Sequence, residues 1–428
     1  MFCAMNNRWI AALVLTGAMV AAGGCSSDPE LVGNGGNTGG GGTNPPTALG
    51  GYASPDGVLI LNQGAPRLEN GSVTWISPEG QVEQNVYRTV NGSACGNTSQ
   101  DLYLYGNKIY IMSNNTEVPD LGNSEPGDGT IVIVDAETFR REKVFHFKDL
   151  KFHKPEGSLE VVDSLPLVTP LENLAVIDEH NLFLADGQGM FRLDTETGEL
   201  TLVEGGYHFG NQGNTIETVV GTRGMTVIGD HLYCSGGGFW TNTQLFEFTK
   251  DSNKLTRSLD LSGEFISGIC RTGDHEIVVA TCGRSGSLKS YLTFVDTETM
   301  SVILEKPISA DISAEFMNSS GVTLAGDYLY FAAGTLTVSR ISLKTWKIEE
   351  YIQVKNDAPQ AEYLTCNVVA DPNKNLLYVS VSNDLNEARI SDGNILVYDC
   401  SGDESKLVMN LENKGSYPVN IYPMSKFY

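Results

Sequence analysis

Three of the six histidines occupy matching positions along the chain. His180, His231 and His275 end the segments "IDEH", "IGDH" and "TGDH". Histidine beside carboxylates is a frequent combination of metal ligands, so a metal centre is the first chemistry to weigh. Each histidine, however, stands in a short turn between two apolar runs. Equivalent turns of a repeated unit lie too far apart to share one ion, so we expect turn residues, no metal site and no cofactor.

Acid–base catalysis is the second chemistry to weigh, since it needs carboxylates that converge on one point. The carboxylates that could face a common surface are instead scattered along the chain: Asp101, Glu172, Asp186, Glu264, Glu315 and Glu362. The chain has neither the G-x-S-x-G nucleophile motif nor a D-x-D-x-D-G calcium loop. We therefore expect no catalytic residues and a protein that is not an enzyme.

Seven apolar runs that follow tight turns reveal a repeat. They begin at Val58, Ile109, Leu182, Leu232, Ile277, Leu329 and Leu377, in steps of 51, 73, 50, 45, 52 and 48 residues. Most are preceded by another alternating run and followed by two more, so one unit holds four strands. A period of about 50 residues with several strands is typical of a β-propeller. The sequence predicts an all-β, seven-bladed β-propeller with four-stranded blades.

The motif Asp-x-Glu-Thr recurs at Asp135, Asp194 and Asp296, each time between two apolar runs. An aspartate side chain can accept a hydrogen bond from the backbone two residues on and so close a turn. We therefore interpret the motif as a structural corner between the third and fourth strands of a blade.

The first unit lacks its opening strand, because "GVLILN" directly follows a glycine-rich segment. The final residues, "YPVNIYPMSKFY", form an alternating run with no unit of their own. We expect this run, around Ile421, to pair beside Leu59 as the innermost strand of the first blade. Such pairing closes the ring and leaves no open sheet edge at the seam. Residues 147–170 form a long insertion before the third blade.

The N-terminal segment has the pattern of a targeting sequence. Residues 1–24 contain the apolar run "WIAALVLTGAMVAA", which is short of the ~20 residues that span a membrane and fits a signal peptide. The segment ends in "AAGGC", which resembles a lipobox and implies lipid attachment at Cys25. Residues 25–52 then form a Gly-rich flexible tether, and residues 53–428 the propeller. The alternative is an ordinary secreted protein.

Composition restricts the partners and the cysteine chemistry. The chain carries 52 acidic against 28 basic side chains, a formal charge of −24, which disfavours nucleic acids and anionic lipid surfaces. We expect contact with a membrane through the lipid anchor only. The six domain cysteines stand singly in apolar runs without a C-x-x-C motif, so we expect mostly buried free thiols.

A propeller places the loops after its second strands and before its first strands on one face, around the central channel. Here these loops are long and contain aromatic residues that can stack on a flat ligand, with Asn and Arg to hydrogen-bond its rim. The ligand-binding candidates on this face are Trp240, Phe239, Tyr207, Phe209, Asn114, Asn115, Asn62, Arg67, Arg284, Tyr363 and Arg389.

The Asp-x-Glu-Thr corners, the C-terminal closure and the lipobox-like Cys25 together resemble the YncE-like (YVTN-type) propellers. The first-blade wording "VLILNQG…GSVTWISPEG" is similar to a domain-of-unknown-function family of Bacteroidota surface lipoproteins that includes BtuG-type corrinoid-binding proteins. The resemblance implies an outer-membrane lipoprotein facing outward. It implies capture of a corrinoid (vitamin B12) or similar chelate, passed to a TonB-dependent outer-membrane receptor.

Two other classes of function remain open from the sequence. The same face could serve as a protein-interaction scaffold of the cell envelope, or the propeller could be a hydrolase or lyase acting on glycans. Ligand binding without turnover would favour the ligand-capture function, and product formation would favour the enzyme.

Overall fold

The structure is a computed structural model of the 428-residue chain. It describes residues 46–47, 50–65, 68–114, 125–153, 165–166, 171–186, 189–207, 220–221, 224–236, 243–283, 289–312, 321–366, 368–371, 373–383 and 393–428. The predicted signal peptide, Cys25 and most of the predicted tether lie outside these residues. No helix among the described residues is long and apolar enough to cross a membrane.

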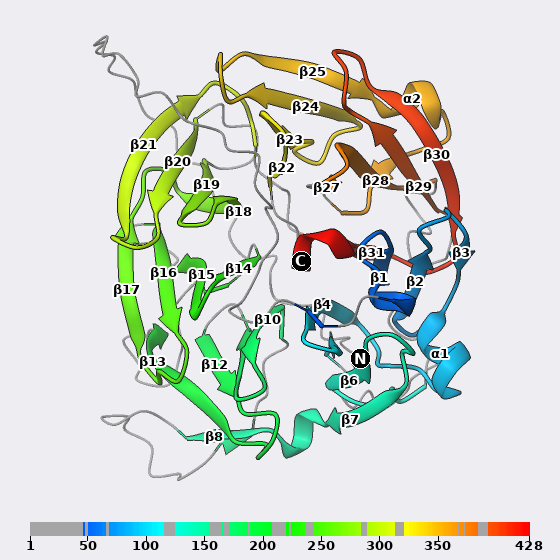
Figure 1. Ribbon diagram of the computed structural model, residues 1–428, viewed down its shortest axis with the longest axis vertical. Coiled ribbons are helices and arrows are strands. Elements are labelled where there is room, and N and C mark those ends of the chain that lie inside the picture. The colour runs from blue at the N-terminus through cyan, green and yellow to red at the C-terminus, as the bar shows by residue number, and fades with distance from the viewer. Residues whose placement is uncertain are drawn as a thin grey trace, which may run out of the picture. The chain divides into compact units, whose positions relative to one another are not determined.

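The predicted propeller is confirmed: seven sheets stand in a ring around a central channel (Figure 1). Blade 2 runs outward in simple order as β4 (Ser99–Tyr105), β5 (Lys108–Ser113), β6 (Ile131–Asp135) and β7 (Arg141–Phe145). Three further blades repeat this order. Blade 4 contains β14 (Met225–Ile228), β15 (His231–Gly236), β16 (Gln244–Thr249) and β17 (Leu255–Asp260). Blade 5 contains β18 (Phe265–Gly273), β19 (Glu276–Cys282), β20 (Ser290–Asp296) and β21 (Ser301–Ile308). Blade 6 contains β22 (Thr323–Ala325), β23 (Tyr328–Phe331), β24 (Thr337–Ser342) and β25 (Ile348–Gln353).

The C-terminal strand closes the ring as the sequence predicts. Blade 1 contains β1 (Val58–Asn62), β2 (Ser72–Ile76) and β3 (Val82–Glu83), and its innermost strand is β31 (Pro418–Pro423). In the register of β1 and β31, Ile60 faces Ile421 and Leu59 faces Tyr422. The two ends of the propeller domain therefore share one sheet.

Blades 1, 3 and 7 depart from the simple order. The outer strand of blade 1 has only two residues, and helix α1 (Val86–Asn91) follows it, although the sequence showed no helical periodicity there. Blade 3 runs outward as β10 (Asn173–Asp178), β11 (Asn181–Ala185), β12 (Gly189–Leu193) and β13 (Leu200–Tyr207). The preceding insertion adds β8 (Lys151–His153), parallel to β13, and β9 (Leu165–Pro166), after the 3-10 turn η2 (Phe147–Asp149).

Blade 7 contains β26 (Tyr363–Leu364), β27 (Val369–Asp371), β28 (Leu376–Ser382), β29 (Gly393–Asp399) and β30 (Lys406–Asn413). Both β26 and β27 pair with β28, so together they take the place of one inner strand. The 3-10 turn η1 (Gly51–Ala53) and the short helix α2 (Val354–Asp357) complete the described elements.

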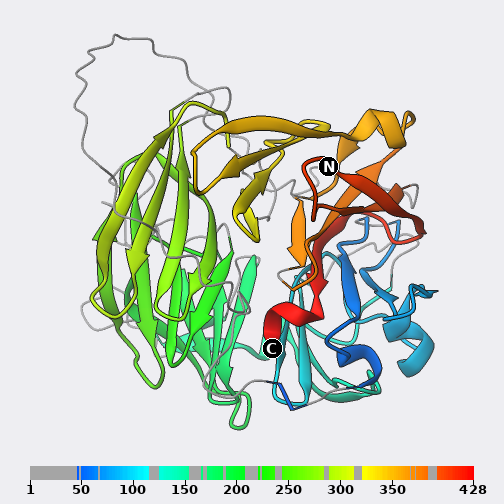
Figure 2. The ribbon, with the colours of Figure 1, turned by 45° about the horizontal axis from the view of Figure 1, so that its top comes forward.

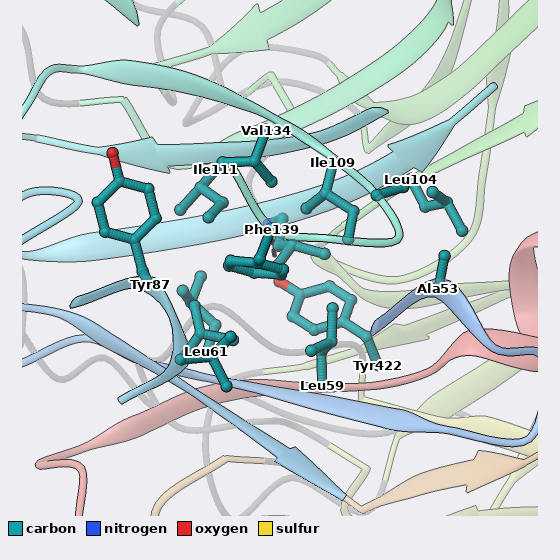
Figure 3. Packing of buried hydrophobic residues seen from close by; sticks show 14 of the residues in the cluster. Ala53, Leu59, Leu61, Tyr87, Leu104, Ile109, Ile111, Val134, Phe139 and Tyr422 are labelled. Atoms are coloured by element: carbon teal, nitrogen blue, oxygen red, sulfur yellow. Dashed lines mark hydrogen bonds between the residues drawn. The ribbon is translucent and has the colours of Figure 1, made fainter. Parts of the chain in front are cut away.

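The core is divided among the interfaces between successive blades. In β5, Ile109 and Ile111 pack toward blade 1, whereas Tyr110 and Met112 pack toward blade 3. Strand side chains alternate between the two faces of a sheet, and here both faces are covered. This explains why the second strands are continuous apolar runs. Figure 3 shows the packing between blades 1 and 2, where β31 contributes Tyr422.

The repeated Asp-x-Glu-Thr motif is a corner, as predicted, but its main hydrogen bond reaches one residue further than expected. The carboxylates of Asp135, Asp194 and Asp296 accept from the backbone N–H of the threonine three residues on, at 2.9, 3.0 and 2.9 Å. Asp194 also accepts from the Glu196 N–H, two residues on, at 2.8 Å. The residue after each threonine adopts positive φ, which turns the chain back into the fourth strand.

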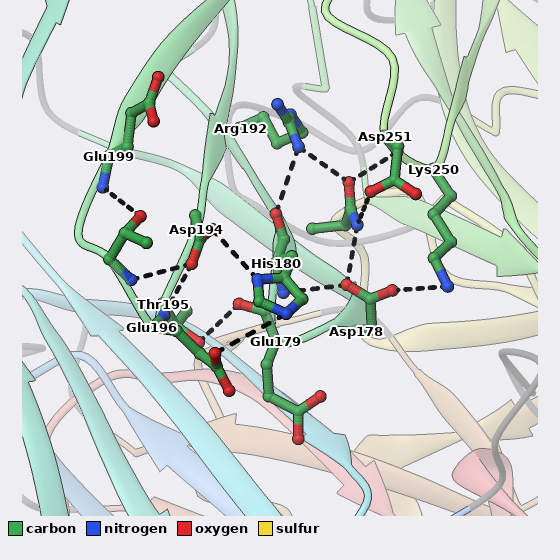
Figure 4. A network of polar contacts seen from close by, with 12 residues as sticks. Asp178, Glu179, His180, Arg192, Asp194, Thr195, Glu196, Glu199, Lys250 and Asp251 are labelled. Atoms are coloured by element: carbon green, nitrogen blue, oxygen red, sulfur yellow. Dashed lines mark hydrogen bonds and ion pairs between the residues drawn. The ribbon is translucent and has the colours of Figure 1, made fainter.

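The three matched histidines lie where the first strand turns into the second: His180 and His275 are in the turns, and His231 is the first residue of β15. Each contacts a carboxylate of its own blade: His180 Nδ1 lies 3.1 Å from Asp194, His231 Nδ1 lies 2.7 Å from Glu247, and His275 Nδ1 lies 3.5 Å from Glu298. The Asp194 contact raises the pKa of His180 (Figure 4). In the same figure, Lys250 of blade 4 joins Asp178 of blade 3 at 2.9 Å. These polar residues tie turns together within and between blades.

The six domain cysteines are all free thiols, and Cys270 alone among them is not fully buried. The prediction of buried free thiols is therefore confirmed. Burial raises the pKa of Cys95 to about 11 and that of Cys366 to about 12, so both are neutral near physiological pH.

Candidate functional site

The centre of the ring is a cavity of about 200 Å³. The innermost strands of all seven blades supply its wall: β4, β10, β14, β18, β22, β27 and β31. Its partly exposed lining residues include the apolar Met225, Leu324 and Val369 and the polar Thr226 and Thr323. A volume well above the ~10–15 Å³ that one water needs leaves room for a small ligand.

The C-terminus occupies the channel at the end where the short turns lie. The turn η3 (Met424–Phe427) follows β31, whose last residue pairs with Val58 at the start of β1. Met424 N–H donates to the Gly57 carbonyl at 3.0 Å, and the Phe427 ring meets the Tyr103 ring edge-to-face at 5.2 Å. Both Figure 1 and Figure 2 show this segment in the middle of the ring. The mouth of the channel on the turn face is thereby occupied by η3.

Asp101 is the carboxylate of the channel wall. One of its oxygens accepts from the Tyr422 hydroxyl at 2.7 Å and from Leu102 N–H at 2.8 Å, and the other from Leu174 N–H at 2.9 Å. Burial raises the pKa of Asp101, and these three bonds oppose that shift. The carboxylate therefore joins the inner strands of blades 1, 2 and 3.

Lys426 is the ammonium of the channel wall. Its Nζ lies 4.4 Å from the centre of the Tyr422 ring and 5.1 Å from that of Phe427, which places the cation over aromatic faces. Burial lowers the pKa of Lys426 to about 8, although the negative charge of Asp101 works against this shift. Within the described part of the chain, Nζ has no hydrogen bond and no carboxylate within 4.0 Å. Lys426 is thus a partly desolvated cation that faces the cavity.

Replacing this cation is expected to stabilise the protein. Lys426→Met keeps most of the side-chain volume, and a pKa lowered from 10.5 to about 8 corresponds to roughly 3 kcal/mol at about 1.4 kcal/mol per unit. We expect Lys426→Met to raise the free energy of unfolding by about 2–3 kcal/mol near neutral pH. Urea unfolding of both proteins at several pH values measures the difference.

The pH dependence of that difference has a defined sign. Below about pH 8 the lysine is charged in both states, so the full cost is present. Between about pH 8 and 10.5 only the unfolded chain holds the proton, so the wild type gains stability relative to the variant. A difference that grows with pH in this window, or a destabilised variant at pH 7, would contradict the assignment.

Four of the binding candidates have described backbones on the loop-rich face or at its edge. Asn62 ends β1, but its side chain is buried and bonded to Ser72 and Thr74, both at 3.2 Å, and to Asn413 at 2.8 Å. Its amide therefore joins blade 1 to blade 7. Tyr363 starts β26 of blade 7 and is half-buried. Tyr207 ends β13, where its backbone pairs with Gly189.

Asn114 follows β5, and its side chain is 7 % exposed. The Asn114 N–H donates to the Thr98 carbonyl at 3.0 Å, whereas its buried Oδ1 has no hydrogen-bond partner among the described residues. Asn62, Asn114 and Tyr363 belong to the neighbouring blades 1, 2 and 7. The other candidates lie outside the described residues: Trp240, Phe239, Phe209, Asn115, Arg67, Arg284 and Arg389.

Three residues with evident roles were not among the sequence candidates. Lys426 and Tyr422 line the channel, and Asn70 joins loops of blades 1 and 2 through bonds of 2.8 and 2.9 Å with the Glu125 backbone. A single lysine in the apolar C-terminal run "YPMSKFY" was the available signal for Lys426. No group of three or more His, Cys, Asp or Glu residues that could hold a metal occurs within the described residues.

The chain belongs to the family described as "Domain of unknown function (DUF5074)", whose model matches residues 56–423. Comparison with curated proteins finds no match. Among solved structures, the chain is similar to Kuenenia stuttgartiensis hydrazine synthase, with 14 % identity, TM-score 0.43, 74 % of this chain and 86 % of that chain covered. It is also similar to dihydro-heme d1 dehydrogenase NirN in complex with DHE, with 11 % identity, TM-score 0.47, and 90 % and 78 % covered.

Proposed function

We propose that this DUF5074-family propeller is a non-enzymatic ligand-capture protein of the outer membrane. It is anchored through lipid on Cys25, faces outward, and passes a small molecule to a TonB-dependent receptor. The first candidate ligand is a corrinoid or a similar chelate, as the resemblance to BtuG-type members of the YncE-like propellers implies.

The observation that carries the proposal is the difference between the two faces of the ring. One face is made of short turns joined by contacts such as His180–Asp194, and η3 occupies its channel mouth. The other face receives the long connections after the second strands and before the first strands. Loops held on a rigid ring lose little freedom on binding, which favours affinity.

Two described side chains of the loop-rich face support binding in preference to catalysis. Asp186 accepts from Gly189 N–H at 2.8 Å, so its carboxylate closes the turn between β11 and β12. Asn114 presents a buried acceptor without a described partner, which a ligand N–H or O–H can satisfy. A neutral amide is suited to hydrogen-bonding the rim of a chelate.

The experiment is calorimetric titration of the purified protein with cyanocobalamin. We expect saturable binding without chemical change of the ligand. Loss of a stacked aromatic costs about 1–3 kcal/mol, so Trp240→Ala is expected to weaken binding about tenfold or more.

The matched control is Trp346→Ala, which alters a tryptophan at the blade-6 corner on the turn face, where it packs against Phe294. This variant should bind as the wild type does. Equal weakening by both variants, or no binding of corrinoids and iron chelates, would contradict capture at the loop-rich face. Conversion of ligand or glycan to product would support the enzyme alternative instead.

A further inference from the structure

The channel contains a cation whose hydrogen-bonding capacity is unused within the described residues. An ammonium has three N–H donors, and burying one without partners is costly. The Lys426 ammonium lies over the Tyr422 and Phe427 rings, whose faces attract its positive charge. The ring faces do not replace the hydrogen-bond acceptors that its three N–H groups require. The side chain lines the cavity, so its donors face space that a ligand can fill.

The other charged groups of the channel already form hydrogen bonds within the protein. Both oxygens of Asp101 accept hydrogen bonds from Tyr422, Leu102 and Leu174. The Arg271 guanidinium donates to the Gly273 carbonyl at 2.9 Å and to Asp274 at 3.0 Å, within its own turn. Lys426 therefore remains the cation available to a ligand among the described lining residues.

We propose that the central channel binds a small monocarboxylate, whose carboxylate pairs with the Lys426 ammonium and whose apolar part packs against the channel wall. A charge-assisted bond to a desolvated ammonium is stronger than a bond between neutral groups. The cavity of about 200 Å³ accommodates a short aliphatic acid, and the partly exposed Met225, Leu324 and Val369 supply apolar wall. Because η3 occupies the turn face, the ligand enters from the loop-rich mouth.

The charge of the ligand follows from the neighbours of Lys426. A single negative charge matches one ammonium, whereas a phosphate dianion would be repelled by Asp101, whose field reaches Lys426, about twice as strongly as a monocarboxylate. The surface of the protein is strongly acidic, with a formal charge of −24, so anions are repelled outside the channel. The site therefore favours small, singly charged, partly apolar acids.

The experiment titrates the purified protein with acetate, butyrate and hexanoate by calorimetry near neutral pH. We expect saturable binding that is strongest for the acid that fills the cavity. Lys426→Met should weaken it about tenfold or more, and Lys426→Arg should retain part of it. The matched control, Lys344→Met, removes one exposed positive charge on the turn face and should leave binding unchanged.

A second readout follows the lysine itself. The rate at which acetic anhydride acetylates each lysine is measured by peptide mass spectrometry, with and without butyrate. We expect butyrate to protect Lys426 and to leave exposed Lys344 unprotected. Failure of all three acids to bind, equal binding by Lys426→Met, or competition by phosphate as strong as by butyrate would overturn the proposal. The proposal does not depend on corrinoid capture, which Trp240→Ala tests separately.

Discussion

Deletion of residues 418–428 is expected to abolish the folded monomer. The deletion removes β31 and η3, and with them four nearly fully buried side chains, Ile421, Tyr422, Met424 and Phe427. Truncating one such residue costs about 2–5 kcal/mol, so the loss of four costs about 8–20 kcal/mol, which is as large as the 5–15 kcal/mol by which domains are typically stable. Blade 1 also loses its innermost strand, and β1 presents an unpaired edge. Circular dichroism melts and gel filtration measure the result.

A shorter deletion separates closure of the ring from occupation of the channel. Removing residues 424–428 leaves β31 paired with β1 and takes away only η3 and Tyr428. We expect this variant to fold with a lower melting temperature. Adding a synthetic peptide of residues 414–428 to the longer deletion should restore part of the native signal. A cooperative melt of the longer deletion near the wild-type temperature would show that closure by β31 is dispensable.

Replacing Glu247 by Leu is expected to cost roughly 3 kcal/mol of stability, the lower end of the range for breaking a buried ion pair. Glu247 of β16 is fully buried and accepts bonds from His231, Tyr233 and Arg257. The leucine would leave Arg257 and the Tyr233 hydroxyl without this acceptor. Arg257 keeps about one third of its side chain exposed, so water limits the loss. Urea unfolding monitored by fluorescence measures the change.

Blade 6 offers the matched control, because the same strand pair there carries the charges in reverse. Arg340 of β24 is 4 % exposed and pairs with Glu349 of β25. Arg340 also lies between the Tyr328 and Tyr351 rings, so Glu349→Leu should cost less than Glu247→Leu. The double variant Glu247→Leu/Arg257→Met should recover most of the lost stability. If it is as unstable as the single variant, the cost arises from packing and not from the unpaired charge.

Much of the fold was available from the sequence. The starts of the seven apolar runs, the corner motif and the orphan run near Ile421 predicted the number of blades and the closure that the strand pairing shows. These features are local: apolar residues that alternate along a strand, and turn residues between strands. They repeat because every blade packs four strands between two neighbouring blades. The helix α1 and the strands β8 and β9 were not predicted, because short irregular segments carry no periodicity.

The candidate site was less accessible from the sequence. Asn62 was proposed as a ligand contact from its loop position, and its bonds to Ser72, Thr74 and Asn413 are a matter of register between blades 1 and 7. The buried Oδ1 of Asn114 has no partner among the described residues, and no local sequence pattern indicates this burial. The aromatic candidates, with Trp240 first, stay predictions for the binding experiments.

By itself, the sequence determined the β-propeller, its seven units and the strand that closes it, because alternating apolar residues and turn motifs act over a few neighbouring positions. Only the tertiary structure decided that Asp101 would meet Tyr422 and Lys426, more than 300 residues further along the chain, in one channel. The reason is that the pKa and the interactions of a charged group depend on its desolvation and on its neighbouring groups. Both are set only when the ring is closed.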